Sequence, residues 1–255
     1  CPSLFCRREV AMSLQILLRR SASWTPTKLA VAGRQVAFFI GGRAFSDTAL
    51  TTPATVSGSV GGMQVVGGTL NATNSTGSQQ PTLQAAGVVR VGTIGGTARG
   101  LSTAASLSIA AADRKGVFFR GTPSGASSTN PTTAATFAGG GGSTRFSLQV
   151  NSAGTHWRCI ARTTASNTVV ALASGKQSVV YEQTDASAAY LQLNGGSLIT
   201  VSVGAGTDGS DQLRVGSSSV TSQSTLDGVV WGFWWGGPAL TTSERALLNE
   251  WAGSY

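Results

Sequence analysis

The sequence predicts an all-β protein, a sandwich or barrel of short antiparallel strands that ends in one helix. Three features of the chain indicate this class. Runs of β-branched, aromatic and aliphatic residues follow one another from residue 29 onward, and Gly, Asn, Ser and Pro separate them. Several runs alternate apolar and polar residues, as a strand with one buried face does. One helix-capping signature precedes an apolar helical period, and it lies close to the C-terminus.

Eleven segments are predicted as strands: 31–40, 63–66, 88–91, 117–120, 145–150, 157–161, 169–173, 178–182, 189–193, 198–203 and 229–235. In the fifth segment the apolar residues Phe146, Leu148 and Val150 occupy every second position. Asn194 and Gly195 can adopt the positive φ of a hairpin turn between two of the segments. Short strands at this spacing, with no helical period between them, are typical of antiparallel architectures.

The C-terminal helix is predicted from its cap. Thr241 can accept a hydrogen bond from the first turn, and Glu244 can reach back to the backbone of Thr241. Leu247, Leu248 and Trp251 then share one face, which we expect to lie on the sheet.

The charge of the chain is positive but dilute. There are 18 Lys and Arg against 10 Asp and Glu, a formal net charge of +8, and only 11% of the residues are charged. Because most arginines are scattered, they give a diffuse positive field that favours acidic partners in general, anionic glycans included. No recognition motif accompanies them, so specific nucleic-acid binding is not expected. No apolar run approaches the roughly 20 residues that cross a bilayer, and no membrane span is expected.

The start of the chain is unusual. Residues 1–23 are predicted to form a basic N-terminal arm, with residues 24–255 as one domain. The arm could be a transit peptide, could dock on another protein or could simply fray. A purine-rich coding stretch before Met12 would resemble a ribosome-binding site. We therefore hypothesise that translation starts at Met12, and the intact mass of the purified chain tests this. A lipidated Cys1 is an alternative hypothesis.

The three cysteines have no metal-like spacing and give no disulfide framework. A bridge between Cys1 and Cys6 is open as an alternative. Cys159 lies in an apolar run, and we expect it to be a buried small hydrophobe.

Two stretches resemble the concanavalin A-like lectin and glucanase (laminin G-like) superfamily, in the form found in structural proteins of tailed phages. The first is 71–107, which begins NATNSTGSQQPTL and includes Arg99-Gly100-Leu101. The second is 227–255, which resembles the closing strand and turn-helix of the family. Trp24-Thr25-Pro26 resembles its opening segment. The resemblance implies a two-sheet antiparallel jelly-roll sandwich over 24–255 with a short C-terminal helix.

The resemblance also implies a function. It suggests a non-enzymatic virion protein of a tailed phage, as head decoration, head fibre or tail-associated module, on the extracellular particle. Other virion proteins or copies of the chain would be partners, through the arm and the sheet edges, with a host glycan as a further ligand. A secreted or cell-surface carbohydrate-binding module is the alternative. The chain lacks the family's acidic residues at 36–42 and 57–68.

Catalytic groups are sparse. Glycanase relatives use paired carboxylates, and the nearest approach here is Glu182 and Asp185, which fall on opposite faces of a strand. We interpret both as solvated turn residues. His156 is the only histidine, no Gly-x-Ser-x-Gly elbow accompanies it, and we interpret it as a structural or edge residue. No enzymatic activity and no cofactor are predicted.

Two candidate binding sites come from the residues. Asp208 and Asp211, within GTDGSDQ, are the candidate metal site, with calcium as the ion and an ordinary acidic turn as the alternative. In the aromatic run, Trp231, Phe233 and Trp235 share one face of a strand and are expected in the core. Trp234 takes the other face and is the candidate carbohydrate-binding residue, exposed to a glycan or a neighbouring subunit.

Overall fold

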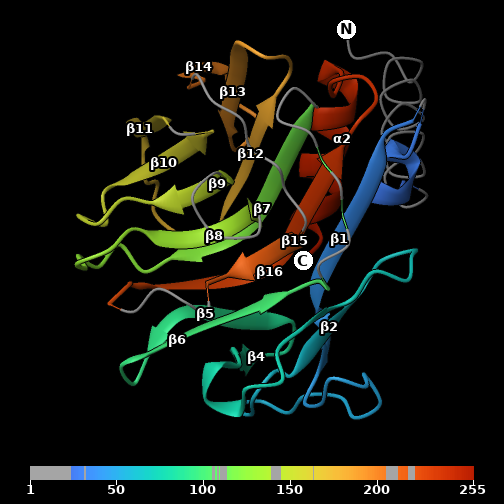
Figure 1. The fold of residues 1–255 in the computed structure, drawn as a ribbon, viewed down its shortest axis with the longest axis vertical. Helices are drawn as coiled ribbons and strands as arrows, with labels where there is room; N and C mark the ends of the chain where they lie inside the picture. The colour runs from blue at the N-terminus through green and yellow to red at the C-terminus, as the bar shows by residue number, and fades with distance from the viewer. Residues whose placement is uncertain are drawn as a thin grey trace, which may run out of the picture.

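The computed structural model describes residues 24–31, 33–104, 107, 109, 114–138, 145–162, 164–204, 212–217 and 222–255. The predicted all-β antiparallel sandwich with a C-terminal helix is confirmed. Within these ranges the chain forms sixteen strands, paired antiparallel, one α-helix and two short 3₁₀ helices (Figure 1). The predicted N-terminal arm lies outside the described residues.

One layer of the sandwich contains β3 (Ala72–Thr73), β6 (Thr97–Ser102), β8 (Thr132–Ala138), β9 (Arg145–Val150), β10 (His156–Ala161), β11 (Thr164–Ala171) and β15 (Gln212–Gly216). The other layer contains β1 (Gln35–Phe45), β7 (Lys115–Pro123), β12 (Gln177–Gln183), β13 (Ala188–Leu193), β14 (Ile199–Ser202) and β16 (Thr225–Trp235). The layers join through β2 (Gly62–Val65) and β5 (Val88–Ile94), and β4 (Thr82–Ala85) pairs with β5. The helical elements are η1 (Pro26–Leu29), η2 (Gly77–Gln79) and α2 (Thr242–Gly253).

The two layers are continuous rather than separate. Hydrogen-bonded pairing runs without a break from β11 to β14, and β5 pairs with both β6 and β16. Rings from strands that are distant in this order nevertheless touch. Three such pairs are Phe119 with Trp157, Phe137 with Phe233 and Phe146 with Tyr181. The sheet therefore folds over on itself and encloses the main core between its two halves.

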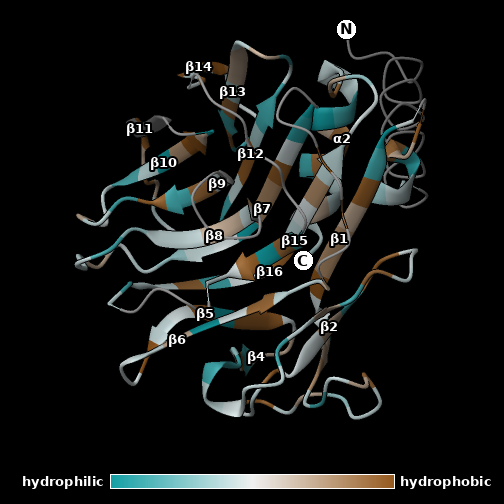
Figure 2. Ribbon diagram, viewed as in Figure 1, coloured by the Kyte–Doolittle hydropathy of each residue, from teal (hydrophilic) through white to brown (hydrophobic). Residues whose placement is uncertain are grey.

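A second, smaller core lies on the outer face of the β1–β16–β7–β12 half. The predicted capping box of Thr241 and Glu244 is present, and α2 follows it. Leu248 and Trp251 of this helix are buried, and the Trp251 ring meets Trp24 edge-on. Hydrophobic residues, brown in Figure 2, lie mainly along the strands, whereas most peripheral loops are white or teal. In the ranges that the structure describes, no helix is long and apolar enough to span a membrane.

Candidate functional site

The expectation that Trp234 faces outward is wrong. Its predicted face is right, because Trp231 and Phe233 belong to the main core and Trp234 belongs to the second. The side chain is only 1% exposed, however, because α2 covers this face of the sheet. The indole lies over Gly116, its partner in the β16–β7 register, where a Cβ atom would overlap the ring. Trp234 therefore cannot stack on a sugar.

Glu182 is also not the solvated residue that the sequence indicates. It is 1% exposed and accepts hydrogen bonds from Trp234 Nε1 at 2.9 Å, Leu240 N at 2.8 Å and Arg245 Nη2 at 3.1 Å. Burial raises the pKa of Glu182, against the opposing effect of these hydrogen bonds and the Arg245 charge. Asp185 does lie in an exposed turn. The two carboxylates share no site, and Glu182 has a structural role, because it accepts hydrogen bonds from three separate parts of the chain.

The other titratable residues considered in the sequence either have a structural role or lie outside the described residues. His156 is half-buried at the start of β10, with its Nδ1 2.9 Å from Thr155 Oγ1. Cys159 is fully buried as predicted, and burial raises the pKa of its thiol well above the ordinary value. Asp208 and Asp211 lie outside the described residues, so the calcium site stays a prediction. Elsewhere in the described ranges, no group of three or more His, Cys, Asp or Glu could hold a metal ion.

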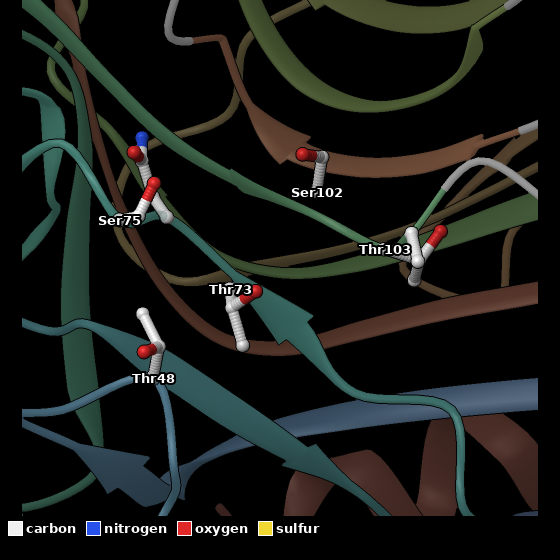
Figure 3. Close-up of a pocket in the computed structure, with 7 residues that line it drawn as sticks. Thr48, Thr73, Ser75, Ser102 and Thr103 are labelled. Carbon is white, nitrogen blue, oxygen red and sulfur yellow. The ribbon is translucent and has the colours of Figure 1, made fainter.

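A polar hollow that the sequence did not predict opens where β3 and β6 meet the loop that follows β1 (Figure 3). Its volume is about 420 Å³. The side chains labelled in Figure 3 surround its space from these three segments. The residues that line it are Thr48, Thr73, Asn74, Ser75, Ser102, Thr103 and Ala104.

The strand register explains why hydroxyl groups gather here. Thr73 lies directly opposite Ser102, so the two side chains share a face of the sheet. Their neighbours Ala72 and Leu101 point the other way, into the main core. Ser75, in the loop after β3, lines the same hollow. The lining hydroxyls outside the core therefore face solvent, and those of Thr48, Thr73, Ser75 and Ser102 bond to no other described residue.

Two polar side chains fix the walls of the hollow. Asp47, next to Thr48, accepts hydrogen bonds from Thr51 N at 3.1 Å and Thr52 N at 2.7 Å. The bond from the Thr51 backbone is the main reason why the pKa of Asp47 is lowered to about 2. On the other wall, Asn74 Nδ2 donates to Gln79 O and Gly100 O, at 3.1 and 2.9 Å. Both loops are thereby held in place before any ligand arrives.

The lining groups suit hydrogen bonding rather than proton transfer. Among them are hydroxyls and one amide, and no carboxylate, imidazole or thiol. Hydroxyls both donate and accept, which suits a neutral or weakly charged polyhydroxy ligand. The only signal in the sequence was the run of Asn, Thr and Ser at 71–76, which is also typical of an ordinary turn.

Neither a protein-family model nor a curated protein sequence matches this chain. Among solved structures, the fold is similar to the Trypanosoma rangeli sialidase. In its complex with 2-keto-3-deoxy-D-glycero-D-galacto-2,3-difluoro-nononic acid the TM-score is 0.55, at 14% identity over 84% of this chain. In its covalent intermediate with 2,3-difluorosialic acid the TM-score is 0.54, again at 14% identity. The chain spans 32% of the length of the sialidase. At this identity the likeness shows a shared fold.

Proposed function

We propose that this chain is a non-enzymatic carbohydrate-binding β-sandwich that takes a saccharide in the hollow between β3, β6 and the loop after β1. One observation carries the proposal: the hydroxyls of Thr48, Thr73, Ser75 and Ser102 border one hollow and have no described partner in the protein. A saccharide supplies the matching donors and acceptors. The volume of about 420 Å³ also falls in the range of about 300–1,000 Å³ that is usual for ligand pockets.

The comparison with solved structures adds support of a general kind. The sialidase with a similar fold has been solved in complex with sialic acid. That ligand is known for the whole sialidase, of which this chain matches 32% of the length, and it makes saccharides the first ligand class to test here. The position of the hollow and its residues come from this chain alone.

A purely binding role is supported by the chemistry of the hollow. Glycosidases generally act through two carboxylates, and sialidases through a tyrosine nucleophile. The lining residues include neither type. Glu182 is enclosed by its three donors, and Tyr181 is buried in the main core, stacked on Phe146.

The proposal is tested by screening the full chain on a glycan array and measuring the best glycan by calorimetry. We expect Thr73→Val and Ser102→Ala each to weaken binding about three- to tenfold, since a net hydrogen bond contributes about 0.5–1.5 kcal/mol. Thr200→Val and Ser202→Ala are matched controls, because both residues are exposed strand hydroxyls on β14. No binding at millimolar sugar, or hollow variants that bind like the wild type, would refute the proposal.

We also propose that the chain serves as a structural protein of a phage virion. Support comes from the sequence resemblance at 71–107 and 227–255 and from the low charge content, which suits close packing in an assembly. Other virion proteins or copies of the chain would then be its partners. Mass spectrometry of purified particles tests this, with the chain expected as a stoichiometric component. A chain found only in the medium or on the cell surface would favour the alternative, a secreted or cell-surface module.

A further inference from the structure

An arginine stands beside the hollow on the same face of the sheet. Arg214 of β15 lies directly opposite Ser102, which in turn lies opposite Thr73. Directly opposite residues in antiparallel strands have Cβ atoms about 5 Å apart and point to the same side. The alternate residues Val215 and Leu101 are in the main core, so Arg214 belongs to the outer face. A row of three side chains thus runs from β3 to β15.

The charge of Arg214 is not matched by any carboxylate in the described part of the chain. Its Nε and Nη2 donate to Gln212 Oε1, at 3.3 and 2.9 Å. This neutral partner leaves Nη1 without a described acceptor. Three other guanidinium groups pair with carboxylates, in Arg34–Glu244, Arg90–Asp227 and Arg245–Glu182. Like Arg214, the guanidinium groups of Arg43, Arg99 and Arg120 bond to neutral oxygens instead.

The nearest acid in the lining segments does not cancel this charge. Asp47 precedes Thr48, but its carboxylate is turned into its own loop. There it accepts hydrogen bonds from Thr51 and Thr52. The hollow therefore offers hydroxyls, and the half-buried Arg214 lies one strand beyond Ser102, outside the lining residues.

We infer that the hollow takes an acidic saccharide, whose hydroxyls bond to Thr73 and Ser102 and whose carboxylate pairs with the Arg214 guanidinium. This inference rests on the proposed sugar-binding function and narrows it to carboxylated sugars. Hydrogen bonds between a guanidinium and a carboxylate are roughly twice as strong as neutral ones. The net charge of +8 adds attraction at long range.

The test compares matched acidic and neutral probes by calorimetry on the full chain at low ionic strength. Trigalacturonate is paired with its methyl ester, and sialyllactose with its methyl ester. We expect the acidic member of at least one pair to bind about tenfold more tightly, as a hydrogen bond to a charged group predicts. The preference should shrink as salt is added, because Arg214 is partly exposed to solvent.

Variants assign the preference to one residue. Arg214→Gln should abolish it, and Arg214→Lys should keep part of it because the positive charge remains. Lys28→Gln is the control, since it removes one exposed charge from η1 and leaves the hollow unchanged. Circular dichroism of each variant verifies the fold.

The outcomes separate the two proposals. Equal binding of acidic and neutral probes overturns the inference and leaves sugar binding in place. A preference for the acidic probe that survives Arg214→Gln also overturns the inference and leaves sugar binding in place. If the four probes fail while the array reports a neutral glycan, the inference is again wrong. If the array is silent as well, both proposals fall.

Discussion

Trp234 Nε1 donates a hydrogen bond to Glu182 Oε1 at 2.9 Å, and each of the two side chains is 1% exposed. The same carboxylate accepts from Leu240 N and from Arg245 Nη2. One acid on β12 therefore ties together β16, the loop before α2 and α2 itself. Buried polar groups cost free energy unless they are paired. The hydrogen bonds to Glu182 therefore hold α2 in place on the sheet.

Removal of the acid should loosen that helix. Glu182→Ala leaves Arg245 and the Trp234 N–H buried without an acceptor, and we expect a loss of about 3–5 kcal/mol in the free energy of unfolding. Glu182→Gln keeps one acceptor oxygen and should cost less, about 1–3 kcal/mol. Urea unfolding followed by tryptophan fluorescence measures both. Glu250→Ala, on the exposed face of α2, is the control and should change stability by no more than about 0.5 kcal/mol.

Two carboxylates at this end of the molecule should respond to pH with opposite signs. Burial raises the pKa of Glu182 above its ordinary 4.5. For Glu244, burial alone would raise the pKa, but hydrogen bonds from Arg34 and Thr241 lower it. A raised acid pKa means that the folded state binds the proton more tightly than the unfolded chain does, and a lowered pKa means the reverse.

The contribution of Glu182 is therefore complete below pH 4.5 and is lost as the pH rises through its folded pKa. The contribution of Glu244 is present above pH 4.5 and is lost as the pH falls. Unfolding free energies between pH 3 and 8 test this in the wild type, Glu182→Gln and Glu244→Gln. Relative to Glu182→Gln, the wild type should lose stability as the pH rises. Relative to Glu244→Gln, it should gain. Parallel curves for all three proteins would contradict the prediction.

The close approach of Trp234 to β7 makes Gly116 sensitive to substitution. A Cβ atom at this position would overlap the indole ring, so Gly116→Ala must displace the tryptophan or the strand. We expect a loss of about 1–3 kcal/mol, as for other overpacked cores. Gly42→Ala is the matched control, because a Cβ atom there meets nothing within 4 Å. Equal stability of the two variants would show that the ring can move aside freely.

Sequence pattern predicted the strongly apolar parts of the fold. All eleven predicted segments overlap strands, and Asn194 has the positive φ of 51° that its hairpin requires. Five strands were missed: β3, β4, β6, β8 and β15. They are short or rich in Thr, Ala and Gly, and β8 reads TTAATFA. Pairing with neighbours that are distant in the sequence holds such strands in place, and local propensity cannot report this.

The candidate site was harder to predict for the same reason. Alternation placed Trp234 on the correct face, but only the tertiary structure shows that α2 covers that face. Glu182 looked like a turn acid, and its three donors come from segments more than 50 positions away. The hollow depends on Thr73 and Ser102, which the register brings together from separate strands. Single polar residues of this kind carry no local signature.

The loop that carries Thr48 offers a further test of the hollow. Asp47 holds this loop through Thr51 and Thr52, so Asp47→Ala should free both backbone amides. We expect faster hydrogen exchange at these two amides and a several-fold weaker affinity for the best glycan on the array. Asp185→Ala is the control, because Asp185 makes similar bonds to Ser187 and Ala188 in another exposed turn.

The pH dependence of that exchange gives the same prediction a second readout. Because the Thr51 backbone bond lowers the pKa of Asp47 to about 2, the carboxylate stays ionised at pH 4 and the loop should keep its protection there. Protection relative to Asp47→Ala should decline only as the pH approaches 2. If Asp47→Ala exchanges faster yet binds the glycan like the wild type, the loop contributes nothing to affinity. The hollow would then be formed by β3 and β6 alone.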